Sequence, residues 1–119
     1  MQPDAADVGY LWDMLNIARE ARERASGRDY QALLDDRDYY LAQLHRVQTI
    51  GEAATHVSRS FVEAHSEIPW RDAIAIRHVI VHGYRVVDPD EIWTVLLRDL
   101  PLLLASLEAI LVGAGGTGD

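Results

Sequence analysis

The chain has 119 residues, of which 49% are hydrophobic and 25% are charged, so it is long enough for one folded domain and too apolar to be disordered. It contains no cysteine, which excludes disulfides and thiolate metal sites and is typical of a reducing, cytoplasmic compartment. Its 11 basic residues, all arginine, against 19 acidic residues give a net charge of -8, which argues against a protein that coats nucleic acid. No apolar run approaches the roughly 18 residues of a membrane span, and the first residues lack the features of a signal peptide.

The hydrophobic periodicity predicts helices along the whole chain. The expected elements, in chain order, are a helix at 4–26, a short turn at 30–34, a helix at about 37–59, a loop or frayed turn at 61–68, a helix at about 69–82 and a last helix at 89–112. Asp29 is placed to cap the short turn, and Pro69 and Pro89 suit the first position of a helix. Pro101 lies inside the last helix and should bend or briefly interrupt it.

These elements predict an all-α fold, an up-and-down bundle of four to five helices. We expect residues 1–112 to form a single domain and residues 113–119, which are rich in glycine, to form a flexible tail. The apolar stripe from Leu96 to Leu111, together with the three tryptophans, exceeds what such a small bundle must bury. We therefore expect a homodimer of twofold symmetry.

Polar residues gather between Arg71 and Arg85, where three arginines, two histidines and one tyrosine fall within 15 residues. On a helix at 100° per residue, Arg71, His78 and His82 share one face, and Arg77 lies near its edge. One interpretation is a polar edge paired with carboxylates of the bundle, such as Glu52 or Asp72. A second is a zinc site, since His78 and His82 are four residues apart, but no third ligand is evident and we expect no metal.

A third interpretation is cleavage of RNA without a metal. This chemistry needs a histidine that transfers a proton near neutral pH and an arginine that binds the phosphate and its developing charge. RNA supplies its own nucleophile, the 2′-hydroxyl, so the protein needs no cofactor. The remaining histidines, His45, His56 and His65, are expected to be ordinary surface or helix-end residues.

The segment from Arg77 to Tyr84 reads R-x4-H-x-Y and resembles the signature of HepT-type toxins of the HEPN superfamily. Further segments similar to that family are Ile50–Ala54 (IGEAA), Ile68–Trp70 (IPW), and Val87–Asp88 with Ile92–Trp93. They follow one another in the family's order over about residues 8 to 110. One position departs from the family, because His78 stands where an asparagine usually follows the motif arginine.

The resemblance implies the toxin of a type VII toxin–antitoxin module, a helical homodimer whose two motifs face a shared cleft. Arg77 and His82 would be the catalytic residues of a metal-independent endoribonuclease. We expect Arg71, His78 and Arg85 to bind the RNA substrate. The resemblance also implies a partner, an MntA-like minimal nucleotidyltransferase, that silences the toxin by transferring AMP to Tyr84. A phosphate and a nucleoside beside a cationic site would repel and block RNA.

Two alternatives to a ribonuclease stay open. The chain could be a non-catalytic HEPN module that binds nucleotide or its transferase partner, which the net charge of -8 and His78 favour. It could also be a purely structural helical dimer.

Overall fold

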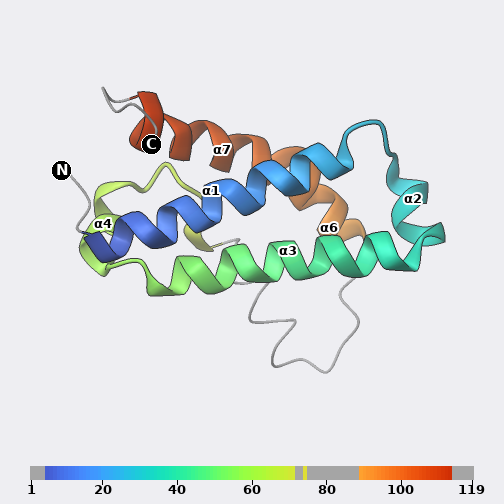
Figure 1. The fold of residues 1–119 in the computed structure, drawn as a ribbon, viewed down its shortest axis with the longest axis horizontal. Coiled ribbons are helices and arrows are strands. Elements are labelled where there is room, and N and C mark those ends of the chain that lie inside the picture. The colour runs from blue at the N-terminus through green and yellow to red at the C-terminus, as the bar shows by residue number, and fades with distance from the viewer. Residues whose placement is uncertain (1–4, 72–73, 75–88, 114–119) are drawn as a thin grey trace.

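The computed structural model describes residues 5–71, 74 and 89–113, and this part of the chain is built from helices and short connections (Figure 1). Its helices are α1 (Ala5–Ala25), α2 (Tyr30–Asp35), α3 (Arg37–His56), α4 (Arg59–Ala64), α6 (Pro89–Thr94) and α7 (Leu100–Glu108), with π-helical turns η1 (Val95–Asp99) and η2 (Ala109–Gly113). Trp70, Arg71 and Ile74 are also helical. The predicted all-α bundle is confirmed. Within these residues, no helix is both long and apolar enough to cross a membrane.

Helix α1 forms the centre of the packing, because it contacts both α3 and α7. α1 and α3 lie side by side and run in opposite directions, and α7 lies along another side of α1 (Figure 1). Apolar residues three and four positions apart on α1, such as Leu11, Leu15 and Ala18, are completely buried. One polar side chain is completely buried between α1 and α3: Gln43 Nε2 of α3 donates to the carbonyl of Ala21 at 2.9 Å.

The turn between α1 and α3 follows local sequence signals. Gly27 adopts a φ of 78°, a left-handed conformation that glycine tolerates, directly after α1. The side chain of Asp29 accepts a hydrogen bond from the N–H of Ala32, as the sequence predicts for the cap of α2. Asp36 caps α3 in the same way through the N–H of Tyr39. This N–H, followed by the hydrogen bond from Arg28, lowers the pKa of Asp36 from its ordinary value of 3.8.

The expected loop at 61–68 is wrong in its first half, where the structure has α4. The cause is Ser58, whose hydroxyl accepts a hydrogen bond from the N–H of Phe61 and so begins a new helix. α3 consequently ends at His56, three residues before the predicted end. Asp7, which is buried in the first turn of α1, accepts hydrogen bonds from the N–H of Ser58 at 2.8 Å and from its hydroxyl at 2.6 Å.

The interruption expected near Pro101 takes the form of the π turn η1. The N–H of Leu100 donates to the carbonyl of Val95, five residues back, and Pro101 follows as an early residue of α7. Proline has no N–H to donate, so a wider turn just before it accommodates the missing bond. The carbonyl of Leu96 in this turn accepts a hydrogen bond from Arg22 of α1 at 3.0 Å.

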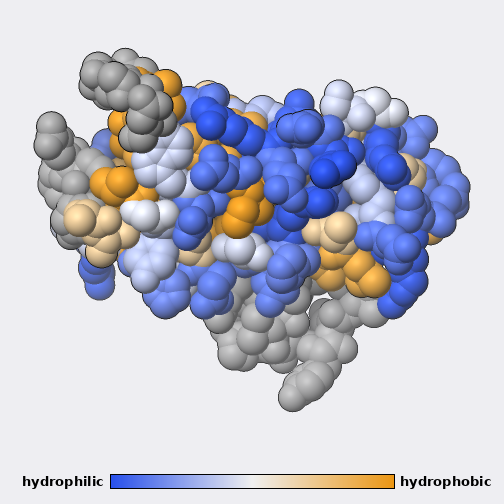
Figure 2. Space-filling model, in the orientation of Figure 1, coloured by the Kyte–Doolittle hydropathy of each residue, from blue (hydrophilic) through white to orange (hydrophobic). Residues whose placement is uncertain are grey.

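The apolar stripe of the last helix is largely buried within one chain, so it gives less support to a dimer than the sequence suggests. Leu96, Leu100, Leu103 and Leu107 are at most 2% exposed. In the described part of the chain, the large apolar side chains that remain exposed are Leu97 and Leu102 near this stripe, Leu34 of α2 and Leu41 of α3. On the face shown in Figure 2, one of the apolar patches lies over the beginning of α3. The homodimer stays a prediction.

Candidate functional site

Arg71 is the one predicted site residue that falls in the described part of the chain. The predicted catalytic and modified residues Arg77, His82 and Tyr84, together with His78 and Arg85, lie outside the described residues. The described residues that lead into the motif are 62–71 and 74.

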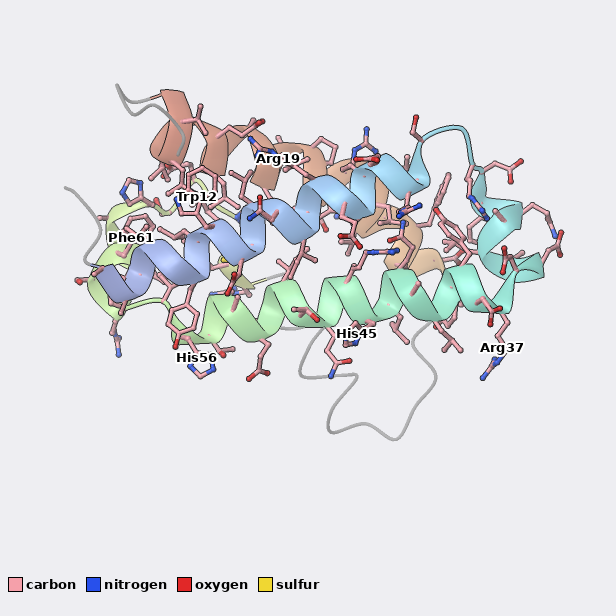
Figure 3. The ribbon with its side chains drawn as sticks, in the orientation of Figure 1. Trp12, Arg19, Arg37, His45, His56 and Phe61 are labelled. Carbon is pink, nitrogen blue, oxygen red and sulfur yellow. The ribbon has the colours of Figure 1, made fainter. Side chains whose placement is uncertain are left out.

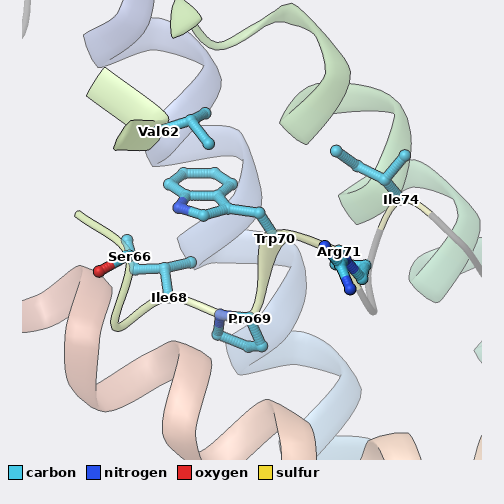
Figure 4. Close-up of a pocket in the computed structure, with 7 residues that line it drawn as sticks. All are labelled: Val62, Ser66, Ile68, Pro69, Trp70, Arg71 and Ile74. Carbon is cyan, nitrogen blue, oxygen red and sulfur yellow. The ribbon is translucent and has the colours of Figure 1, made fainter. Parts of the chain in front are cut away.

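Arg71 borders a hollow that we call the Trp70 pocket, with a volume of about 490 Å³ (Figure 4). Its lining residues are Val62, Ser66, Ile68, Pro69, Trp70, Arg71 and Ile74. Most of this lining is apolar, with a hydroxyl from Ser66 and a guanidinium from Arg71. In Figure 4 the indole of Trp70 lies between Val62 and Ile68.

The wall formed by Trp70 is fixed to the bundle by specific contacts. Its indole N–H donates to the carbonyl of His65 at 2.9 Å, and its side chain is largely buried. Phe61 of α4, which is completely buried, meets the indole edge to face at 6.2 Å between ring centroids. These two contacts hold the indole against α4 without a ligand.

His65 joins this cluster in a way that the sequence did not predict. The sequence predicts an ordinary surface or helix-end histidine. The residue is the C-cap of α4, but its ring stacks on Phe61 at 4.3 Å and its side chain is only 19% exposed. Its Nδ1 lies 3.3 Å from a carboxylate oxygen of Glu67, and its Nε2 is buried with no hydrogen-bond partner among the described residues. A hydrogen bond from Nδ1–H to Glu67 leaves Nε2 as a bare, buried acceptor. A histidine at a helix end gives no sequence signal for this arrangement.

Arg71 differs from most arginines of the described ranges in having no partner there. Arg19, Arg28, Arg46, Arg59 and Arg98 each form an ion pair with a carboxylate. The two carboxylates that precede Arg71 within this segment are engaged elsewhere, since Glu63 pairs with Arg59 at 2.9 Å and Glu67 faces His65. The exposed guanidinium of Arg71 is thus available to an anion.

Carboxylates were one expected partner of the cationic cluster, but the described residues do not decide this interpretation. Glu52 forms an ion pair with His56 at 3.4 Å, and Asp72 lies outside the described residues. His56 also stacks on Tyr10 at 5.1 Å, and both His45 and His56 are exposed on α3, as expected (Figure 3). Among residues 5–71, 74 and 89–113, no three His, Asp or Glu side chains gather closely enough to hold a metal ion.

A smaller hollow of about 190 Å³ lies at the α2–α3 corner. Its lining residues are Leu33, Leu34, Arg37, Tyr40 and Pro89. Pro89 begins α6, so this hollow adjoins the other end of the segment that carries the motif. Arg37 projects from the bundle at the start of α3 and, like Arg71, makes no ion pair with another residue of the described part (Figure 3).

A sequence model of the ribonuclease HepT-like family matches residues 14–110. The chain belongs to this family. The match spans α1 through α7 and includes the whole R-x4-H-x-Y segment, so the resemblance drawn from the motifs is confirmed.

Curated relatives of this HepT-like chain agree with the family. It is 24% identical over 101 residues to "Putative RNase MJ1380" of Methanocaldococcus jannaschii, which covers 85% of this chain and 93% of that protein. It is 28% identical over 101 residues to "Probable ribonuclease HepT" of Thermococcus cleftensis, which covers 85% of this chain and 92% of the relative. A search of the solved structures found no significant match.

Proposed function

We propose that this chain is a metal-independent endoribonuclease and the toxin of a toxin–antitoxin pair. The observation that carries the proposal is the spacing of Arg77, His82 and Tyr84 in a chain of the ribonuclease HepT-like family. The exposed guanidinium of Arg71, which has no partner within the described part of the chain, supports it, because an RNA substrate requires cations near the site of cleavage.

The proposed reaction begins with attack of the RNA 2′-oxygen on the adjacent phosphorus. A bond from O2′ to phosphorus forms and the bond from phosphorus to O5′ breaks, which leaves a 2′,3′-cyclic phosphate and a 5′-hydroxyl. His82 transfers a proton in this step, as a base toward the 2′-hydroxyl or as an acid toward the leaving oxygen. Arg77 stabilises the negative charge that grows on the phosphate oxygens. Arg71, His78 and Arg85 hold the flanking RNA.

Cleavage of RNA by purified variants tests this proposal. We expect His82→Ala and Arg77→Ala each to lower the cleavage rate by about 100-fold or more, with wild-type activity retained in EDTA. His45→Ala is the matched control, since it removes an exposed histidine of α3 and should cut like the wild type. Equal cleavage by wild type and His82→Ala would contradict the assignment of His82.

We further propose that the active form is a homodimer whose two motifs face a shared cleft. Support comes from two exposed leucines, Leu34, which lines the hollow that Pro89 borders, and Leu41 on α3. Light scattering at micromolar concentration should give twice the mass of the chain. A strict monomer in that measurement would contradict the proposal.

The proposed regulation is AMPylation of Tyr84 by an MntA-like nucleotidyltransferase. The tyrosine oxygen attacks the α-phosphorus of ATP, the bond to pyrophosphate breaks, and the phenolic proton leaves to solvent. Incubation with the transferase, ATP and magnesium should add AMP mass that peptide mass spectrometry maps to Tyr84. Tyr84→Phe should abolish this addition and leave cleavage of RNA largely intact. Equal labelling of Tyr84→Phe would contradict this role.

A second candidate is a non-catalytic module that binds nucleotide or the transferase. The net charge of -8 and His78 in place of the family's asparagine favour it. It predicts binding of the transferase with no cleavage of RNA by the wild-type protein, which the same assay distinguishes.

A further inference from the structure

We propose that the Trp70 pocket holds one base of the RNA substrate while Arg71 binds that nucleotide's phosphate. This inference rests on the proposed ribonuclease function and adds a subsite at which the enzyme would select among bases. Three features of the pocket carry it, namely its form, its rigidity and its charge.

The form of the pocket suits a nucleotide. Its volume of about 490 Å³ lies within the range of roughly 300–1,000 Å³ that is usual for small-ligand sites. The partly exposed apolar residues of its lining, Val62, Pro69 and Ile74, can cover the face of a base, and the exposed Ser66 hydroxyl can donate to or accept from a base edge. Single-stranded RNA is commonly recognised in this way, with unstacked bases placed against flat or apolar side chains.

The rigidity of the pocket lowers the cost of binding. The hydrogen bond from the Trp70 indole to the His65 carbonyl, at 2.9 Å, and the contact with Phe61 fix the indole wall. Because the largely buried indole is already held in place, this side of the pocket loses little conformational freedom when a base enters.

The charge favours a nucleotide over an uncharged ligand. Arg71 has no ion pair or hydrogen bond within the described part of the chain, and the nearby Glu63 and Glu67 face Arg59 and His65 instead. A guanidinium can bind a phosphate through two parallel hydrogen bonds. Arg71 also precedes Arg77 by six residues in sequence, a distance of at most about 22 Å for any backbone conformation. A base in the pocket is therefore within a few nucleotides of the phosphate that Arg77 would stabilise.

The experiment measures the affinity of the full chain, with His82→Ala to prevent cleavage, for fluorescent oligo-A, oligo-C, oligo-G and oligo-U. We expect unequal affinities for the four oligomers. Arg71→Ala should weaken binding about tenfold and reduce its dependence on salt. Val62→Phe, which fills the pocket without changing charge, should weaken binding about tenfold, reduce the difference among the four bases and leave the salt dependence unchanged.

Arg24→Ala is the matched control, because Arg24 is an exposed arginine of α1 without an ion pair in the described part, and its loss should change binding less than twofold. Melting temperatures verify that each variant is folded, and Arg71→Ala, at an exposed position, keeps the test valid if Val62→Phe does not fold.

If Arg71→Ala binds RNA like Arg24→Ala, the inference is overturned, even if the wild type cleaves RNA. The same holds if Arg71→Ala weakens binding of the transferase alone, since the pocket is then a protein contact. If the oligomers bind as expected but the wild type does not cleave RNA, the proposed function fails and the base subsite stands.

Discussion

Replacement of Trp70 by phenylalanine should destabilise the protein because the indole N–H holds the chain at the entry to the motif segment. The substitution removes the hydrogen bond to the His65 carbonyl, which contributes about 1 kcal/mol. The carbonyl keeps its second bond, from the N–H of Ile68 at 3.2 Å, so no buried acceptor is left unpaired. The smaller ring gives up apolar contact worth about another 1 kcal/mol. The sum is a loss of about 2 kcal/mol, or a melting temperature about 8 °C lower for a chain of this size.

Thermal unfolding followed by circular dichroism measures this loss directly. Trp12→Phe is the matched control, since Trp12 packs on the core but its indole makes no hydrogen bond within the described residues. Trp12→Phe should therefore lose only apolar contact, which lowers the free energy of unfolding by about 1 kcal/mol or less. If Trp70→Phe and Trp12→Phe lower the melting temperature equally, the indole hydrogen bond does not stabilise this wall and the reasoning is wrong.

Two further predictions concern the polar contacts of the bundle. Asp7→Ala removes a buried carboxylate that accepts two hydrogen bonds from Ser58. The free energy of unfolding, measured with urea, should therefore fall by about 3 kcal/mol, and a fall of less than about 1 kcal/mol would contradict this. The N–H of Tyr39 and the side chain of Arg28 lower the pKa of Asp36 in the folded state. The ionised carboxylate therefore stabilises the fold above pH 3.8, and this contribution is lost as the pH falls through the folded pKa. The stability difference between wild type and Asp36→Asn should therefore shrink in urea titrations below pH 3.8, and a difference that is constant with pH would contradict the account.

Local signals in the sequence predict much of the fold. The spacing of Leu11, Leu15 and Ala18 gives the buried side of α1, and Asp29 caps α2 as its position suggests. The helix α4 was missed because Ser58 can equally continue α3 or begin a new helix. Its partner Asp7 lies 51 residues away in sequence, so no local pattern contains this contact.

The candidate site, like the fold, could be predicted from the sequence only in part. The R-x4-H-x-Y segment and Arg71 can be recognised from residue types and spacing. The wall of the Trp70 pocket depends on a carbonyl at His65 and on an aromatic contact with Phe61, which hydrophobic periodicity does not encode. The stripe from Leu96 to Leu107 illustrates the opposite error, since the sequence shows that it is apolar but not that α1 and its neighbours already bury it.

Cleavage of an RNA oligonucleotide, compared with the same oligonucleotide carrying a 2′-deoxyribose at the cleaved position, tests the central claim most directly. The account predicts that the purified protein in EDTA cuts the RNA to a 2′,3′-cyclic phosphate end, that it leaves the deoxy-substituted oligonucleotide intact, and that His82→Ala cuts neither. Equal cutting of both oligonucleotides by the wild type, or cutting that EDTA abolishes, would contradict attack by the 2′-hydroxyl without a metal.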